Sequence, residues 1–328
     1  MAYNEILPFI LFTGLIIALL LVDLVVLQRR AHSIGMKEAA ALSAMWIALA
    51  LCFNVFIYFM YENRWLDAGQ ASLRALSGNE AALQFLAGYL VEESLSVDNI
   101  FVFVVIFSYF GVPSKYQHKI LFWGILGAII MRFAFIVTGS VLIARFEWIL
   151  YIFGIILIVS GWKMMMQGEM EVHPEKNIFI RLTKKWFPVT QGFEPPKFLI
   201  RKDGKLWVTP LLIVLITVET TDVVFAVDSI PAVFGITRDP FIVYSSNMFA
   251  ILGLRSIYFV LAGMMKSFHY LKYGLSCILI FIGAKMLVAD FVHIPIGASL
   301  MVIGGILAIS VSMSIARNRR EQSKERQP

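Results

Sequence analysis

Long apolar runs, separated by short polar segments, repeat along almost the whole chain. About 20 consecutive apolar residues are enough for one helix to cross the hydrocarbon core of a bilayer. We therefore predict nine membrane-spanning helices, at residues 5–28, 38–61, 80–110, 120–143, 148–166, 209–234, 241–265, 273–289 and 297–316. The third run is too long for one straight span, so its helix should be tilted or broken. The predicted fold is an all-α, polytopic membrane helical bundle.

The composition agrees with this class. Of the 328 residues, 59% are hydrophobic and only 15% are charged, and the mean hydropathy is +0.79. A soluble domain of this size could not bury so much apolar surface. The N-terminal segment lacks the basic start and the cleavage site of a secretory signal, so we interpret it as a retained span.

The positive charges lie mainly on one side of the predicted membrane. With the N-terminus outside, 20 of the 28 Lys and Arg residues fall in the inner segments and four in the outer segments. Cytoplasmic loops carry such an excess, so we predict a periplasmic N-terminus and a cytoplasmic C-terminus. The net charge of +6 is then a topology signal, and nucleic acid is not expected as a partner.

Two acidic stretches inside apolar runs resemble each other. When "EESLSVDNI" (92–100) is laid over "DVVFAVDSI" (222–230), polar positions coincide, and the match continues downstream. The pairs are Glu92 with Asp222, Asp98 with Asp228, Asn99 with Ser229, Arg132 with Arg255 and Lys163 with Lys285. Matches in the same order predict two three-span repeats, 80–166 and 209–289. An odd number of spans gives the two copies opposite orientations, as in many transporters.

The other segments complete the predicted organisation. Residues 1–61 hold two spans, and residues 297–328 hold the last span and a basic tail. The inner loop 167–208 is the one sizeable soluble part, and "KFLIRKDGKLWVT" within it predicts a small β-hairpin. About 40 residues cannot build a core of their own, so we do not predict an enzyme.

The sequence gives little support for thiol or soft-metal chemistry. Cys52 and Cys277 each lie inside an apolar run, and we expect them to be buried packing residues without a disulfide. The five His residues lack a pair at ligand spacing. No permanently bound cofactor is predicted.

Six carboxylates lie in the two acidic stretches and a seventh lies in the first span, although a charge at mid-bilayer costs about 2.5–3.5 kcal/mol on insertion scales. They are Asp23, Glu92, Glu93, Asp98, Glu219, Asp222 and Asp228. Only four cations share the spans with them, namely Arg132, Arg255, Lys163 and Lys285. The excess negative charge predicts either protonated acids or a bound cation, and a divalent metal ion supplies charge of the right size.

The candidate ligands are hard oxygen donors, which favour Mn²⁺, Mg²⁺ or Ca²⁺ over Cu(I). Pro231 lacks an N–H and should break its helix, leaving the Val227 carbonyl free beside Asp228. In an unbroken helix Glu92 and Asp98 lie about 9 Å apart along the axis and on different faces. They can share an ion only if residues 94–97 unwind, and otherwise they mark successive stations on a path. We also predict that Asp98 and Asp228 meet near the midplane and bind one ion together.

Structural interpretations of these residues stay open. Glu93 has no partner in the repeat and need not bind metal. Asp23 lies near the inner end of its span and can pair with Arg29 or Arg30. The four intramembrane cations can act as counter-ions, as gating residues or as side chains that extend toward the membrane surface. They are Arg132, Arg255, Lys163 and Lys285.

The stretches "YLVEESLSVDNIFVF" and "VETTDVVFAVDSIPAVFGIT", joined by "FPVTQGFEPPKFLIRKDGKLWVTPL", resemble the TerC family over nearly the whole chain. TerC proteins are grouped with LysE-type exporters and are associated with manganese efflux and, by older naming, with tellurium resistance. The resemblance implies a multi-pass protein of the bacterial inner membrane with Mn²⁺ as its transported substrate. It implies these ion-handling residues: Glu92, Asp98, Asn99, Glu219, Asp222, Asp228 and Ser229.

Four functions are open at this point. The first is Mn²⁺ export, with protons as a coupling ion through the same carboxylates. The second is a membrane redox modulator or tellurium-resistance component that acts through partner proteins. The third is an interaction protein that docks partners on loop 167–208. The fourth is an amino-acid exporter in which Arg132 or Arg255 binds the substrate carboxylate.

Overall fold

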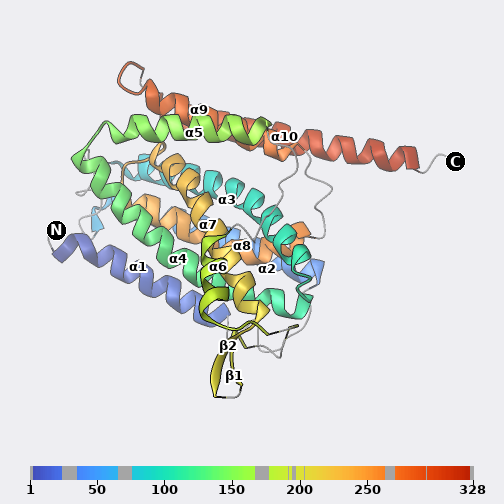
Figure 1. Ribbon diagram of the computed structural model, residues 1–328. Helices are drawn as coiled ribbons and strands as arrows, with labels where there is room; N and C mark the ends of the chain where they lie inside the picture. Colours follow the sequence, from blue (N-terminus) through green and yellow to red (C-terminus); the bar gives the residue numbers. More distant parts are fainter. Residues whose placement is uncertain are drawn as a thin grey trace.

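The computed structural model describes residues 3–23, 35–65, 76–166, 177–190, 192–193, 197–202, 204–262, 270–292 and 294–325. Helices dominate these ranges and build an all-α bundle, as predicted (Figure 1). In chain order they are α1 (Tyr3–Val22), α2 (Met36–Glu62), α3 (Gly78–Tyr109), α4 (Ser114–Arg145), α5 (Ile149–Met166), α6 (Ile178–Trp186), α7 (Pro210–Phe234), α8 (Pro240–Ala262), α9 (Leu271–Leu287) and α10 (Ile296–Glu325).

All these helices except α6 coincide with the apolar runs. Six of them are long and apolar enough to cross a membrane, namely α2, α4, α5, α7, α8 and α10. The apolar part of α1 is shorter, α9 has only 17 residues, and α3 carries Glu92, Glu93 and Asp98. A multi-pass membrane protein is therefore supported, while crossing by α1, α3 and α9 stays a prediction.

The surface of the bundle is apolar, as contact with lipid requires. Ile130, Trp162 and Met301 are each at least 60% exposed, which is unusual for large apolar side chains of a soluble protein. Cys52 and Cys277 are free and also exposed, so the prediction that they are buried is wrong. A thiol behaves as a small apolar group, so a lipid-facing position suits it as well as the core does.

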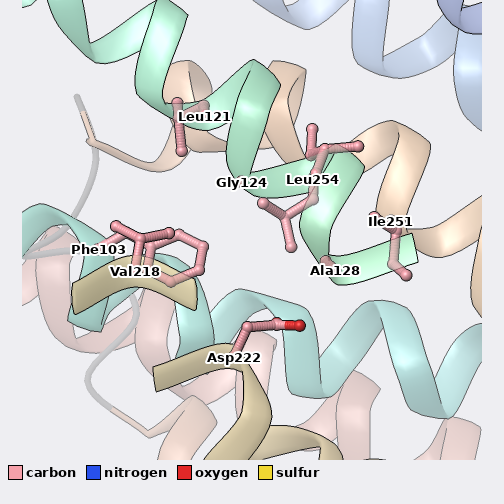
Figure 2. A pocket seen from close by; sticks show the side chains of 9 residues that line it. Phe103, Leu121, Gly124, Ala128, Val218, Asp222, Ile251 and Leu254 are labelled. Carbon is pink, nitrogen blue, oxygen red and sulfur yellow. The ribbon is translucent and has the colours of Figure 1, made fainter. Parts of the chain in front are cut away.

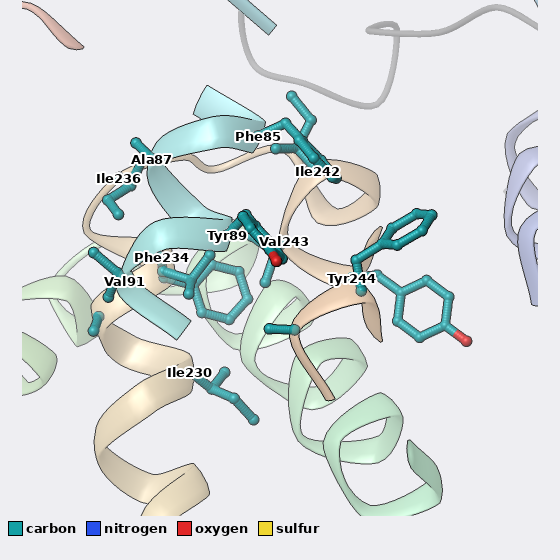
Figure 3. Packing of buried hydrophobic residues seen from close by; sticks show 14 of the residues in the cluster. Phe85, Ala87, Tyr89, Val91, Ile230, Phe234, Ile236, Ile242, Val243 and Tyr244 are labelled. Atoms are coloured by element: carbon teal, nitrogen blue, oxygen red, sulfur yellow. The ribbon is translucent and has the colours of Figure 1, made fainter. Parts of the chain in front are cut away.

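α8 occupies the centre of the bundle, because α2, α3 and α4 all pack against it. Figure 3 shows part of this core, which contains Phe85 and Tyr89 of α3, Phe234 of α7 and Tyr244 of α8. Gly88 allows α3 to approach closely, because a Cβ there would lie 2.9 Å from Ser246 Oγ. The central helices thus hold the polar residues of α3, α7 and α8 away from lipid.

α5 and α9 lie side by side along one edge of the bundle, with α10 next to α9 (Figure 1). Two glycines bring their backbones into contact. A Cβ at Gly283 of α9 would lie 2.6 Å from the carbonyl oxygen of Gly154 in α5. This helix pair is therefore packed too closely to accept side chains at these positions.

Two helices that could have been interrupted are continuous. α3 stays helical through residues 94–97, where Ser94 Oγ donates to the Leu90 carbonyl and no Pro or Gly interrupts the turn. α7 continues past Pro231 to Phe234, so the predicted break is wrong. Pro231 lies in the last turn, where the missing N–H removes one hydrogen bond near a helix end rather than in its middle.

β1 (Leu199–Lys202) and β2 (Lys205–Val208) pair antiparallel where the sequence predicted a hairpin. Gly204 forms the turn with φ +76°, a conformation that glycine adopts at little cost. The hairpin projects from one end of the bundle (Figure 1). The preceding helix α6 was missed, because its nine residues are too short for a search based on membrane-length runs.

Candidate functional site

A fully buried arginine joins four helices. Arg132 of α4 has 0% exposure and forms ion pairs with Glu92 of α3 and Asp222 of α7. Its guanidinium also donates hydrogen bonds to Ser229 Oγ of α7 at 3.3 Å and to Asn247 Oδ1 of α8 at 3.1 Å. The first acids of the two motifs thus share one cation, in the cluster that we call the Arg132 cluster.

The Arg132 cluster is incompletely satisfied. It contains two carboxylates for one guanidinium, so two ionised acids leave a net negative charge. Glu92 Oε2 and Asp222 Oδ2 are buried, and neither has a hydrogen-bond partner among the described residues. Because an unpaired buried acceptor costs free energy, a proton or a cation near these oxygens would stabilise the cluster.

Sequence reasoning found part of this cluster and missed another part. Ser229 was predicted as a metal ligand, and in the structure its hydroxyl accepts from Arg132. Asn247 was missed, although a signal exists. It ends the run "YSSN" inside an otherwise apolar segment, and Ser245, Ser246 and Asn247 are all completely buried.

A small cavity lies beside Asp222 (Figure 2). Figure 2 shows the Asp222 carboxylate in the wall of this cavity, together with Phe103 of α3 and Leu254 of α8. Asp222 is the one charged residue among the described residues that line it. The volume of about 10 Å³ is close to the minimum that holds one water molecule. The Arg132 cluster is therefore tightly enclosed.

The second acids of the motifs lie outside the Arg132 cluster, and both are half-buried. Asp228 accepts a hydrogen bond from Ser160 Oγ of α5 at 2.6 Å, and Lys163 of the same helix attracts it electrostatically. Lys272 at the start of α9 attracts Asp98 in the same way. Since α5 and α9 pack against each other, Asp98 and Asp228 both interact with this helix pair.

Two other intramembrane acids lie against glycines. A Cβ at Gly127 of α4 would be 2.1 Å from Glu219 Oε1, so the Glu219 side chain fills the space beside this glycine. Glu93 approaches Gly253 of α8, and both its carboxylate oxygens are buried without a hydrogen-bond partner. Burial without a partner is costly, so Glu93 is an unsatisfied acid that the repeat did not mark.

The second arginine of the repeat has a partner outside the repeat. Arg255 of α8 forms an ion pair with Asp23, which directly follows α1. The alternative partners Arg29 and Arg30 lie outside the described residues. This contact ties the N-terminal helix to the centre of the bundle.

The predicted metal ligands are brought together only in part. In the ranges that the structure describes, no three His, Cys, Asp or Glu side chains form a group that could hold a metal ion. Asn99 is buried, and its amide nitrogen has no hydrogen-bond partner. Because α3 is continuous, Glu92 and Asp98 cannot bind the same ion. The remaining interpretation is that they mark separate positions.

Comparisons with known proteins give a consistent result. The family model described as integral membrane protein TerC family matches residues 77–322. Over 314 residues the chain is 45% identical to the membrane protein STKORF319 of Myxococcus xanthus, covering 96% of this chain and 93% of that protein. Over 314 residues it is 46% identical to Alx of Escherichia coli (strain K12), covering 95% of each, and the name of Alx proposes a membrane-bound redox modulator. No solved structure matches the chain.

Proposed function

The chain belongs to the TerC family of integral membrane proteins, and from this premise we propose that it transports a hard divalent cation, with Mn²⁺ export as the specific reaction. The observation that carries the proposal is the excess of carboxylates in the bundle interior. Glu92 and Asp222 share one arginine, and Glu93 has no hydrogen-bond partner in the part of the chain that the structure describes. The residues support a hard divalent cation, and the family resemblance narrows this class to manganese.

We assign different roles to the first and second acids of the motifs. Glu92 and Asp222 hold Arg132 and thereby fix α3, α4 and α7 relative to one another. Asp98 and Asp228 carry the ion, because they are half-buried and no buried arginine holds them. Nearby lysines of α5 and α9 stabilise these two carboxylates electrostatically when no metal is bound.

The proposal includes nine spans and an inverted repeat, and the helix packing supports this symmetry. If the repeat exchanges α3 with α7, α4 with α8 and α5 with α9, the contacts that α3 and α7 make with the other half of the repeat should correspond to each other. The contact of α3 with α8 corresponds to that of α7 with α4, and the contact of α3 with α9 corresponds to that of α7 with α5. All four contacts occur. Rocking of the two halves could then bring Asp98 and Asp228 to one ion and expose it to either side.

The proposed setting is the bacterial inner membrane, with the N-terminus in the periplasm and the C-terminus in the cytoplasm. Protons are the proposed coupling ion, because carboxylates that release a metal ion can take up protons. The ion is a transported substrate, and no permanently bound cofactor or enzymatic reaction is proposed.

Uptake of a panel of divalent ions into inside-out membrane vesicles tests the proposal. Vesicles with the wild-type chain should accumulate Mn²⁺, and Asp98→Asn and Asp228→Asn should each abolish this uptake at normal protein abundance. Glu93→Gln is the matched control, because it removes an intramembrane acid without a repeat partner and should keep uptake. If wild-type vesicles take up no ion faster than vesicles without the protein, the transport proposal fails.

A second candidate is a membrane redox modulator or tellurium-resistance component that works with partner proteins. The name of the Alx relatives favours it. Thiol chemistry would have to use Cys52 of α2 and Cys277 of α9, which are both free. Replacing both cysteines therefore separates this candidate from cation transport.

A further inference from the structure

A large cavity opens at one end of the bundle, away from the acidic motifs. Its volume is about 480 Å³. The wall is built from the start of α3, the turn that follows α7, the end of α9 and the start of α10. None of the seven intramembrane acids lines it. We call this space the end cavity, and it is separate from the proposed ion path.

Two cationic side chains line the end cavity. Arg238 in the turn after α7 is exposed, and Lys285 of α9 is half-buried. Within the described ranges, neither side chain lies within 4.0 Å of a carboxylate oxygen. Both also line a smaller cavity of about 60 Å³. Lys285 thus differs from Lys163, its counterpart in the repeat, which lies near Asp228.

The polar groups around these cations leave them available for a ligand. Among the described residues of the wall Glu80 is the one acid, and its carboxylate accepts hydrogen bonds from the Ser77 backbone and hydroxyl at 3.2 Å in the cap of α3. Gln84 Oε1 accepts from Thr237, so the amide N–H groups of Gln84 remain as donors. The cavity therefore offers donors and positive charge, while its acid is already engaged.

We propose that the end cavity binds a phosphate group, carried by a lipid headgroup or by a small phosphate ester, through Arg238 and Lys285. An arginine fork matches phosphate oxygens bidentately, and a lysine adds a point charge. The start of α10 at Ile296 contributes the partial positive charge of a helix N-terminus. Apolar wall residues such as Phe234 and Val292 suit the carbon part of such a ligand.

The size of the cavity agrees with this ligand class, because small-molecule sites usually occupy about 300–1,000 Å³. The predicted topology places the end cavity on the periplasmic side, where outer-leaflet headgroups and periplasmic phosphate esters are both within reach. The inference goes beyond cation transport and does not depend on it, because binding is measured without a metal ion.

The test uses the full-length protein in nanodiscs of phosphatidylcholine, whose headgroup carries no net charge. In one arm, inorganic phosphate and glycerol 3-phosphate are titrated by calorimetry. In the other arm, native mass spectrometry counts the phosphatidylglycerol molecules that the protein retains. Binding in the first arm identifies a free phosphate ligand, and retention in the second arm alone identifies a lipid headgroup.

In the arm that shows binding, the double variant R238Q/K285Q should lose affinity about tenfold or more, because two charge-assisted contacts are removed. The matched control is R201Q/K205Q in the hairpin, which removes two exposed cations elsewhere and should bind as the wild type does. The charge-conserving R238K/K285R variant should keep most of the affinity, and it serves as the readout if the glutamine variant unfolds. If wild type shows no binding in either arm, or if the hairpin control loses as much affinity as R238Q/K285Q, the proposal is overturned.

Discussion

At the scale of single residues, Arg132 is the group on which the stability of the bundle interior depends most. A buried charge is costly unless it is paired with an opposite charge and hydrogen-bonded. Glu92, Asp222, Ser229 and Asn247 supply these partners from three helices. Loss of Arg132 would leave two buried carboxylates facing each other, whereas loss of one carboxylate leaves the arginine still paired.

Arg132→Gln should therefore lower the free energy of unfolding by about 3–5 kcal/mol, the range for breaking a buried ion pair. Glu92→Gln should cost clearly less, because Asp222 and Asn247 still hold the guanidinium. Thermal unfolding in detergent and abundance in membranes measure both effects. The double variant E92Q/R132Q should lose less free energy of unfolding than the two single variants lose in total. Equal stability of R132Q and wild type would contradict this account.

Asp228 leads to a different expectation, because it is bound by Ser160 and not by a buried arginine. Asp228→Asn should fold normally, since no arginine is left unpaired. The wild-type protein should become more stable as Mn²⁺ is added, by about 2.7 kcal/mol when the ion reaches 100 times its Kd. D228N should lose this stabilisation while its melting temperature without metal stays unchanged. A Mn²⁺-dependent rise as large in D228N as in wild type would exclude Asp228 from the ion site.

At the scale of helices, the contact between α5 and α9 holds together the elements that flank Asp98 and Asp228. Gly283→Ala would place a methyl group 2.6 Å from the Gly154 carbonyl oxygen, and backbone cannot move aside as a side chain does. We expect the free energy of unfolding to fall by about 1–3 kcal/mol, as in other overpacked cores.

The matched control is Gly305→Ala in α10, where nothing lies within 4 Å. The control should be neutral or stabilising by up to about 1 kcal/mol, because alanine favours the helix. Equal melting temperatures for both variants would refute the close packing.

Most helices could be predicted from sequence, because lipid imposes long apolar runs that are easy to recognise. The wrong predictions concern residues whose structure depends on their position in a helix or on helix packing rather than on the local sequence pattern. Pro231 stays inside α7 because it lies in the last turn, and α6 is too short to produce a membrane-length run. Cys52 was expected in the core because an apolar run does not distinguish the lipid-facing side of a helix from its packed side.

The sequence predicted which residues belong to the site, but it did not predict which of them form ion pairs with each other. The repeat identified Glu92, Asp222 and Arg132, yet sequence spacing alone could not reveal that both acids bind this one arginine. It also could not reveal that Arg255 finds its partner in Asp23, because that contact joins segments 232 residues apart. Long-range partners depend on how helices pack, and a single sequence does not specify this directly.

At the scale of the whole molecule, the two candidate functions make opposite demands on the cysteines. The double variant C52S/C277S removes every thiol of the chain and should keep metal transport and folding, because both side chains lie on the exposed surface of the bundle. Mn²⁺ uptake in vesicles and redox phenotypes in cells are measured on the same strain. If a redox phenotype disappears while protein abundance and uptake stay normal, the redox candidate becomes the better description.

The last prediction concerns the orientation of the helices, on which the inverted repeat depends. α3 is the critical element, because Glu92, Glu93 and Asp98 in its middle keep it from meeting the usual composition of a membrane span. If it crosses, its two ends lie on opposite sides of the membrane, and the second repeat has the opposite orientation. In the cysteine-free background, Asn79→Cys near the start of α3 should react with a membrane-impermeant thiol reagent in intact cells with a permeabilised outer membrane. Tyr109→Cys at the other end should react only in inside-out vesicles, as should Lys202→Cys in the hairpin. All three positions are exposed on the protein surface. A position that fails to react is therefore on the side of the membrane that the reagent cannot reach, and burial inside the protein is not the cause.

Labelling of both α3 ends from the same side would show that α3 does not cross the membrane. The first repeat would then have an even number of crossings, and the two halves would be parallel. Asp98 and Asp228 could not then exchange roles across the membrane, and alternating access by two inverted halves would be untenable.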